Sequence, residues 1–198
     1  MGVAVRVAQL MDLPCDGTRF SLPPLEIELR RRLWWTIRRL ESRCAEENGF
    51  QPACSNYFSD TRFPLNINDQ DIGPESKELP LPRIGFTGMT FCLIGFEMVD
   101  LISRINQVYI KSGDAGSEPA EILEQKLMLA EECEAKLQST YLQHCCNTRP
   151  FDWMTMKFTN LMMVSRLLQI SNGYILTLSD QSSTSYLSSI WASDEQTP

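Results

Sequence analysis

Apolar residues recur at helical spacing along most of the chain. This spacing predicts helices over 3–11, 25–49, 87–110, 118–145 and 151–170, then a short apolar piece at 174–178 and a last helix at 186–191. No stretch of any length alternates between apolar and polar residues, as a half-buried β-strand would. We therefore expect one all-α domain over residues 1–198, an irregular bundle of about six or seven helices with a frayed tail at 192–198.

The segment 25–49 places arginines on both sides of two adjacent tryptophans. Its leucines and isoleucine recur at spacings of four, four and three, which predicts one buried stripe: Leu29, Leu33, Ile37 and Leu40. Trp34 and Trp35 border this stripe and are expected in the core. Arg30, Arg31 and Arg38 fall on the opposite flank, where nearby glutamates offset their charge. We interpret the segment as a packed helix with a solvated edge rather than a nucleic-acid-binding surface.

Residues 50–86 form a long Pro/Asn-rich loop. Prolines and glycines interrupt any regular element there, and 63–75 is rich in Asn and Asp, whose side chains bond their own backbone in turns. A loop of this length inside a compact domain is usually functional or wraps the surface. We expect 75–82 to be its most exposed part.

The second half of the chain contains three helices of different character. The helix from 87 has a polar stripe of Glu97, Asp100 and Arg104, which either lines a cavity or, as we favour, is the solvated side of a surface helix. The helix 118–145 has an acidic face and is expected to be amphipathic. The helix 151–170 is apolar nearly all round, which indicates a central position, and Asn172 and Gly173 are expected to break it.

Composition narrows the classes of protein. The formal net charge is −7, which argues against a free-standing nucleic-acid-binding domain. Seven cysteines occur at irregular spacing without a CxxC pair, which is typical of reduced thiols in an intracellular protein and predicts neither a zinc site nor another metal or cofactor. No signal peptide or apolar run of transmembrane length is present, so we expect a soluble intracellular protein without membrane contact.

Carboxylates are the main candidates for acid–base chemistry. Asp69 and Asp71 lie two residues apart and could share one side of an extended loop, with Asp60 and Arg62 beside them. A DxD pair can also hold a divalent metal with a pyrophosphate substrate, although Asx turns and helix caps are its commoner use. The polar stripe of the helix from 87 supplies the other candidates. The sequence does not bring these residues together, so a catalytic role stays unassigned.

The remaining candidates are sulfur-containing and aromatic residues. The single histidine, His144, lies near a predicted helix end, where packing or capping is more usual than catalysis. Methionines gather on the helix 151–170, and methionine suits both irregular cores and adaptable apolar pockets. The candidate lining of an apolar ligand pocket is Trp34, Met154, Met162 and Met163.

Six stretches, taken in their order along the chain, are informative about the family: AVRVAQLMDL, LPPLEIELRRRLWWTIRRLESRCAEENG, DTRFPLNINDQDI, GMTFCLIGFEM, YLQHC and RPFDWMTMKFTNLMM. Together they resemble the fungal-specific transcription factor domain, the middle homology region of fungal zinc-cluster regulators. The resemblance spans roughly residues 2–170, and RRRLWW and PLNINDQDI are its most specific parts. It implies an all-α regulatory domain, usually inside a longer nuclear protein, that tunes a DNA-binding module and in some members receives a small molecule.

The chain departs from that family in two respects. The six-cysteine zinc cluster is absent, and Met1 stands where the family would already be mid-domain, so the chain resembles the C-terminal part of the family's domain. We expect the loss of the first helices to uncover apolar surface on the Val3 and Leu33 faces. A protein partner or a second copy of the chain would cover that surface.

Two functions are compatible with these features. The first is a regulatory or interaction domain derived from a zinc-cluster transcription factor, located in the nucleus, without its own DNA-binding module or direct DNA binding. The alternative is a stand-alone cytoplasmic protein of fungal secondary metabolism that binds an apolar small molecule in a helical cavity. In that case it acts as a binding protein or as an enzyme of the isomerase or cyclase type. Enzymatic activity is left open, and a purely structural subunit is a third possibility.

Overall fold

The computed structural model describes residues 2–48, 59–115 and 119–194 of the chain. Five α-helices carry the fold in these residues: α1 (Gly2–Leu10), α2 (Pro24–Glu47), α3 (Thr90–Ala115), α4 (Pro119–Thr140) and α5 (Pro150–Asp194). Short 3-10 turns lie between them: η1 (Gly17–Phe20), η3 (Asp69–Asp71) and η4 (Leu142–His144). The described residues contain no β-strand, which confirms the predicted all-α class.

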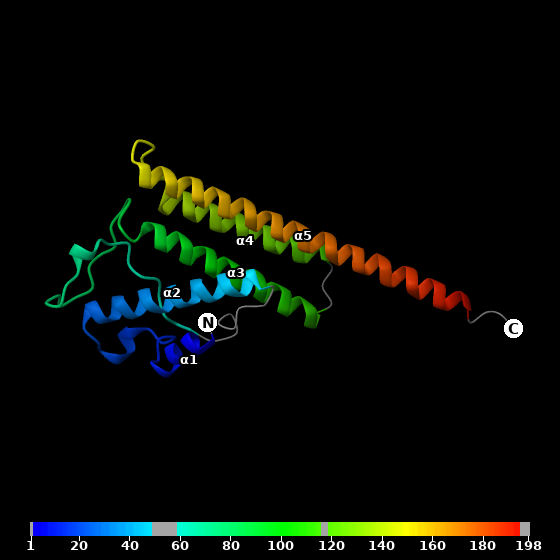
Figure 1. Cartoon of the computed structure of the whole chain (residues 1–198), viewed down its shortest axis with the longest axis horizontal. Coiled ribbons are helices and arrows are strands. Elements are labelled where there is room, and N and C mark those ends of the chain that lie inside the picture. Colours follow the sequence, from blue (N-terminus) through cyan, green and yellow to red (C-terminus); the bar gives the residue numbers. More distant parts are fainter. Residues whose placement is uncertain (1, 49–58, 116–118, 195–198) are drawn as a thin grey trace.

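The helices lie across the molecule in chain order. Figure 1 shows α1 beside α2, α2 beside α3, and α3 beside the pair formed by α4 and α5. The loop that leads from residue 59 to α3 crosses one end of this stack, and α5 runs far past the other helices at the opposite end. No helix in the described residues is long and apolar enough to cross a membrane.

Local sequence signals explain where the helices begin. Three helices start at a proline, Pro24, Pro119 and Pro150, because the fixed φ of proline suits the first turn and its missing N–H would have no helical partner there. Two threonines bond the backbone at the start of α3, one just before the helix and one at its first residue. The Thr87 N–H donates to Oγ1 of Thr90 over 2.8 Å, and the Thr87 hydroxyl accepts a hydrogen bond from the N–H of Met89.

The hydrophobic core is centred on α3. Leu93, Ile94, Phe96, Met98 and Leu101 are all buried there and pack against residues of the neighbouring helices. Both tryptophans of α2 join this cluster, which confirms their predicted place in the core. From α1, α4 and the segment after α4 the cluster takes Val5, Ala8, Cys133, Leu137 and Tyr141. Burial of each large side chain contributes on the order of 1.5–3 kcal/mol to stability.

The position predicted for the helix 151–170 is wrong. α5 lies at the edge of the bundle, and its apolar side chains Trp153, Leu161, Val164 and Leu168 face outward. In the N-terminal part of α5 the buried side chains are polar: Asp152, Thr155 and Thr159. A nearly uniform apolar pattern therefore did not indicate which side of this helix would be covered.

Several predicted helix limits are also wrong. α5 continues through Asn172 and Gly173 to Asp194, so the pieces predicted at 174–178 and 186–191 belong to one helix and 192–194 are not frayed. Residues 111–115 also belong to α3, which was predicted to end at residue 110. A single glycine costs a helix about 1 kcal/mol relative to alanine, which a long helix tolerates. These continuations explain why the described residues contain fewer helices than predicted.

The loop prediction is confirmed where it can be compared. Residues 59–89 are irregular apart from η3, whereas 50–58 lie outside the described residues. Residues 75–82 are mostly exposed, and the most exposed apolar side chains of the loop, Leu81 and Ile84, lie at and just beyond the end of that range. The acidic face of α4 is solvated as predicted, although α4 ends at Thr140 and η4 follows it.

Candidate functional site

The three consecutive arginines of α2 do not form a solvated flank. Successive residues of a helix point about 100° apart, so the three guanidinium groups leave α2 in different directions. Arg30 donates to two backbone carbonyls just after α1, over 2.8 and 2.9 Å. Arg31, which is 2% exposed, forms two hydrogen bonds to the carboxylate of Asp16. Arg32 reaches Asp69 in the loop over 2.6 Å. The prediction that Arg31 lies on the solvent-exposed face of α2 is therefore wrong.

Asp16, Arg31, Thr18 and the backbone of Arg62 form a buried hydrogen-bonded cluster, which we call the polar knot, and Asp16 lies at its centre. Its carboxylate accepts two hydrogen bonds from Arg31, two from Thr18 and one from the backbone N–H of Arg62. Burial by itself would raise the pKa of Asp16, but these donors hold it well below its usual range. A buried carboxylate with this many donors fixes the positions of the turn after α1, of α2 and of the loop relative to one another.

Of the four residues in the stripe predicted on α2, Ile37 packs against the core as predicted, whereas the three leucines do not. Leu29, Leu33 and Leu40 are about half exposed, while Ile27 and Trp34 are buried on another side of the helix. The tryptophans decide the orientation because their indole N–H groups find partners in the loop: Trp34 donates to Ser59, and Trp35 donates to the carbonyls of Thr61 and Arg62. Large rings with satisfied donors bury more area than leucines.

The carboxylates predicted in the loop are engaged in structure. Asp60 accepts the Asp16 N–H and pairs with Arg19, whereas Asp69 pairs with Arg32. Asp71 accepts the N–H of Asn68 in a capping box and forms an ion pair with Arg83. Those pairings turn Asp69 and Asp71 toward different arginines, so they do not converge on one metal or substrate. Arg62 contributes its backbone groups to the knot and is itself exposed.

The polar stripe of α3 runs along the contact with α4, where Glu97 is buried and Arg104 is partly exposed. Glu97 is buried and accepts a hydrogen bond from Lys136 over 2.7 Å, and Arg104 pairs with Glu132. With Asp100 these residues line a cavity of about 60 Å³. Burial raises the pKa of Glu97 above its usual range, against the opposing effect of the Lys136 ammonium. The cavity has room for a water or two but not for an organic substrate.

The predicted apolar pocket does not form as a unit. Trp34 and Met163 are buried in the core, and Met154 is exposed. Met162 alone among the four lines a cavity, which lies between α2, α3 and α5. The seven candidate residues for acid–base work and the four for ligand binding are thus distributed over separate places in the fold.

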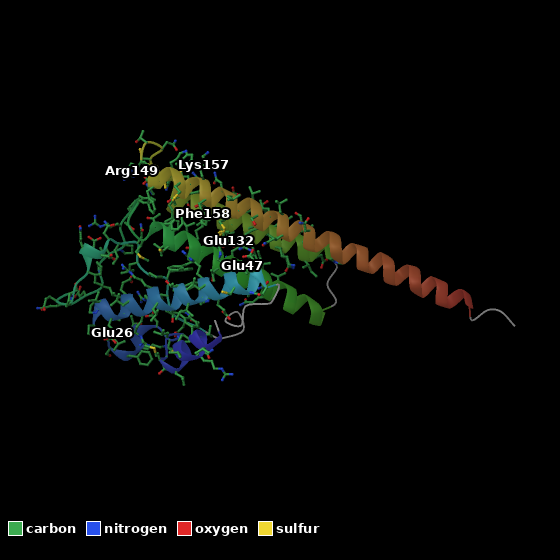
Figure 2. All side chains as sticks on the ribbon, in the orientation of Figure 1. Glu26, Glu47, Glu132, Arg149, Lys157 and Phe158 are labelled. Atoms are coloured by element: carbon green, nitrogen blue, oxygen red, sulfur yellow. The ribbon has the colours of Figure 1, made fainter. Side chains whose placement is uncertain are left out.

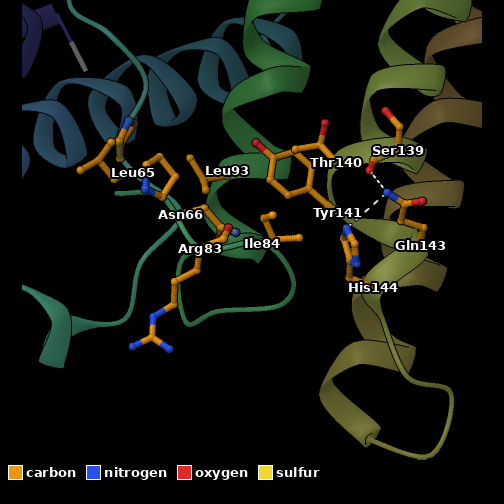
Figure 3. Close-up of a pocket in the computed structure, with 12 residues that line it drawn as sticks. Leu65, Asn66, Arg83, Ile84, Leu93, Ser139, Thr140, Tyr141, Gln143 and His144 are labelled. Carbon is orange, nitrogen blue, oxygen red and sulfur yellow. Dashed lines mark hydrogen bonds between the residues drawn. The ribbon is translucent and has the colours of Figure 1, made fainter. Parts of the chain in front are cut away.

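A first surface hollow lies where the loop meets the end of α4. Figure 3 shows Leu65, Asn66, Arg83 and Ile84 on the loop side, and on the other Tyr141 and His144. The side chain of Gln143 donates to the Ser139 carbonyl and contacts the His144 ring at 3.2 Å. The volume is about 480 Å³, but none of the described residues that line it is a carboxylate or a thiol. The hollow therefore offers His144 no acid–base partner.

A second cleft lies between the C-terminal half of α2, the N-terminal half of α3 and α5. Its volume is about 400 Å³, within the range of small-molecule sites. Glu47 and Phe158, labelled in Figure 2, mark its α2 and α5 walls. Phe91, Met98 and Ile102 of α3 form the apolar floor, and arginines and glutamates form the rim. This cleft is the best-formed candidate binding site.

One rim ion pair joins α5 to α2 across the cleft. Arg166 donates to both carboxylate oxygens of Glu46 over 2.8 and 2.9 Å, and Gln169 donates to the same carboxylate. The hydrogen bond from Arg166 lowers the pKa of Glu46, although partial burial opposes it. One residue in the sequence could have indicated this site: Gly95 interrupts the apolar α3, where a glycine needs a packing reason.

Metal chemistry has no support in the described part of the chain. No group of three or more His, Cys, Asp or Glu side chains there could hold a metal ion. The six cysteines described form no disulfide, and Cys54 lies outside the described residues.

The comparisons with known proteins decide the family. The family model described as the fungal specific transcription factor domain matches residues 1–192. The chain belongs to this family. The predicted resemblance is thereby confirmed over almost the whole length. No solved structure matches the chain significantly.

Three relatives of this fungal transcription factor domain carry names that describe regulators. The chain is 42% identical over 93 residues to the pyriculol/pyriculariol biosynthesis cluster transcription factor 1 of Pyricularia oryzae, covering 47% of this chain and 12% of that protein. It is 37% identical over 99 residues to the aurofusarin cluster transcription factor aurR2 of Gibberella zeae, covering 49% and 15%. It is 28% identical over 170 residues to the transcriptional regulator AacuB of Aspergillus aculeatus, covering 85% and 23%. The chain thus spans less than a quarter of the length of each.

Proposed function

We propose that this fungal transcription factor domain is a regulatory and interaction module that tunes the transcription of a biosynthetic gene cluster in the nucleus. The names of the relatives in Pyricularia oryzae and Gibberella zeae, both cluster transcription factors, support this setting. The module acts through contacts with other protein segments rather than by reading DNA itself. Its net charge of −7 agrees with that division of labour.

The observation that carries the proposal is apolar surface left uncovered on both sides of the bundle. On one side Val3 and Leu10 of α1 are 80% and 85% exposed, with Leu33 of α2 half exposed. On the other side Leu161 and Leu168 of α5 are 66% and 59% exposed. Large exposed apolar side chains in such numbers are typical of protein-interaction surfaces. The exposure of Val3 and Leu33 supports the expected face, which a protein partner or a second copy would cover.

A transcription reporter tests the regulatory role directly. The chain is placed between a heterologous DNA-binding domain and an activation domain in yeast, and compared with a flexible spacer of equal length. We expect reporter output several-fold below that of the spacer, because the domain restrains the activator through its apolar faces. Leu161→Glu should restore output, whereas Asn160→Glu adds the same charge at a polar neighbour and should not. Output equal to that of the spacer contradicts the proposal.

The alternative function is a small-molecule-binding protein or an enzyme of the isomerase or cyclase type. The cleft between α2, α3 and α5 favours binding of an apolar molecule. Catalysis has less support, because Asp60, Asp69 and Asp71 are tied into ion pairs and Glu97 faces a cavity of only about 60 Å³.

Gene disruption in the native host separates the two functions. Loss of a regulator changes the transcripts of several biosynthetic genes together, which RNA sequencing detects. Loss of an enzyme leaves those transcripts in place and leads one intermediate to accumulate, which mass spectrometry detects. The regulatory proposal expects the first outcome, and the second outcome would establish the enzyme.

A further inference from the structure

The charged rim of the cleft between α2, α3 and α5 is unbalanced. Three arginines and two glutamates line it. Arg43 pairs with Glu47, and Arg166 pairs with Glu46. Arg39 is the third arginine, half-buried on α2, and it has no ion pair or hydrogen bond with any residue in the described ranges. One positive charge at the cleft is therefore available to a bound molecule.

Arg39 is held against α3 by the absence of a side chain at Gly95. A Cβ atom at Gly95 would lie 2.9 Å from Nη1 and 3.1 Å from Cδ of Arg39. Any other residue at this position would push the guanidinium away. Glycine inside a helix costs about 1 kcal/mol relative to alanine, and this close packing explains why α3 has glycine at position 95.

The cleft has an adaptable apolar floor beside that charge. Phe91 and Phe158 pack ring against ring, with centroids 5.3 Å apart, and Met98 and Met162 lie in the same lining. Thioether side chains adjust to irregular shapes, and aromatic faces suit flat or elongated apolar bodies. The remaining space, about 400 Å³, accommodates a small organic molecule.

A second polar group points to a ligand in the same cleft. Arg166 is 8% exposed, and its Nε–H has no hydrogen-bond partner in the described structure, although its two terminal nitrogens bond Glu46. A buried donor without a partner costs about 1–3 kcal/mol. Glu46 follows Arg39 by seven residues on α2, roughly 10 Å at the rise of an α-helix. The half-buried Arg39 and the Arg166–Glu46 pair therefore line different parts of the cleft.

We propose that this cleft binds an amphipathic organic anion. The carboxylate of the ligand pairs with Arg39, since a guanidinium group binds a carboxylate through two parallel hydrogen bonds. The apolar body lies against Phe91, Met98 and Phe158, and an oxygen farther along the ligand accepts the Arg166 Nε–H. The biological role of such a ligand, as a signal that tunes the domain, rests on the proposed regulatory function.

Binding is tested on the purified full chain with naphthoate as the anion and naphthamide as its uncharged counterpart, by calorimetric or fluorescence titration. We expect naphthoate to bind about ten-fold more tightly than naphthamide, because only the acid pairs with Arg39. Arg39→Gln should abolish that difference by weakening naphthoate alone, and Met162→Trp should weaken both by filling the cleft. Arg104→Gln removes an arginine that pairs with Glu132 outside the cleft and should change neither affinity.

Gly95→Ala provides a second variant that keeps every charge. It displaces the Arg39 guanidinium and should weaken naphthoate without affecting naphthamide, so the proposal stays testable if Arg39→Gln does not fold. The inference is overturned if neither compound binds at millimolar concentration, if both bind equally, or if the variants at 39 and 95 leave the preference intact. Reporter repression without binding would refute this inference alone, and binding without repression would refute the regulatory proposal alone.

Discussion

α3 and α5 are both long and rich in apolar residues, yet they occupy opposite kinds of position. α3 lies between α2 and α4 and buries Leu93, Phe96 and Leu101. α5 packs on α4 with polar residues such as Thr155 and Thr159 inward, and it exposes Leu161 among its large apolar side chains. The apolar content of a helix indicates how much of its surface should be buried. It does not indicate that other parts of the same chain bury it. The outer face of α5 is left exposed and suits a protein partner.

The largest contrast should appear when one phenylalanine is truncated on each helix. Phe96 is 1% exposed and Phe151 is 48% exposed. We expect Phe96→Ala to lower the free energy of unfolding by about 3–5 kcal/mol, because it leaves a cavity in the core. Phe151→Ala removes only edge contacts with Phe86 and Phe91 and should cost at most about 1.5 kcal/mol. Urea denaturation measures both, and equal losses would mean that α5 is as firmly packed as α3.

The polar knot beside the core gives a second large effect. Asp16→Ala leaves the Arg31 guanidinium buried without its carboxylate, which should cost about 3–5 kcal/mol in chemical denaturation. The double variant Asp16→Ala with Arg31→Met should regain much of that loss, since no charge is then buried alone. A double variant as unstable as the single one would show that Asp16 acts mainly through its hydrogen bonds to Thr18 and Arg62.

A pH-dependent effect is expected at the contact between α3 and α4. Because burial raises the pKa of Glu97 in the folded chain, its contribution to stability is complete below the unfolded pKa and is lost as the pH rises through the folded value. Glu97→Gln keeps the neutral form at every pH. We expect the variant to gain stability relative to the wild-type chain as the pH is raised from 4 toward neutral, about the range in which carboxyl groups titrate. Urea denaturation across that range would contradict this if the wild-type chain gained instead, in which case the Lys136 ion pair outweighs burial.

The smallest effect on stability should accompany a change in association. Leu161→Glu and Leu168→Glu lie on the outer face of α5, where surface substitutions change the free energy of unfolding by no more than about 0.5 kcal/mol. Removing the exposed leucines should nevertheless reduce concentration-dependent self-association in light scattering. Asn160→Glu is the matched control on the same helix. If scattering is independent of concentration for the wild-type chain and for Asn160→Glu as well, this face does not mediate self-association.

The sequence predicted the existence and class of the helices better than their orientation. Trp34 and Trp35 were placed in the core because large aromatic residues at helical spacing bury the most area. The buried place of Arg31 was not predictable, because its partner Asp16 lies fifteen residues away in a turn and periodicity does not reveal pairing. The helical spacing of Leu29 and Leu33 indicated that both lie on one face of α2, but it did not show whether that face would be buried or exposed.

Only single residues of the candidate site could be predicted from the sequence, not their arrangement in one cleft. Met162 was assigned to a pocket from composition, but Arg39, Phe91 and Arg166 come from three different helices, and only the folded arrangement brings them to one cleft. Gly95 was the local clue, because it departs from the pattern of a buried helix. The loop carboxylates showed the reverse case, since turn-forming Asp69 and Asp71 served as structural partners of Arg32 and Arg83.

The three consecutive arginines of α2 also restrict insertions and deletions in the residues just before them. Arg30, Arg31 and Arg32 are tied to three separate segments, the end of α1, the turn at Asp16 and the loop at Asp69. Inserting or deleting one residue between Pro24 and Arg30 would rotate all three guanidinium groups by about 100° and detach every segment at once. Point substitutions of the exposed leucines leave that register untouched, so this part of α2 tolerates changes of identity far better than changes of length.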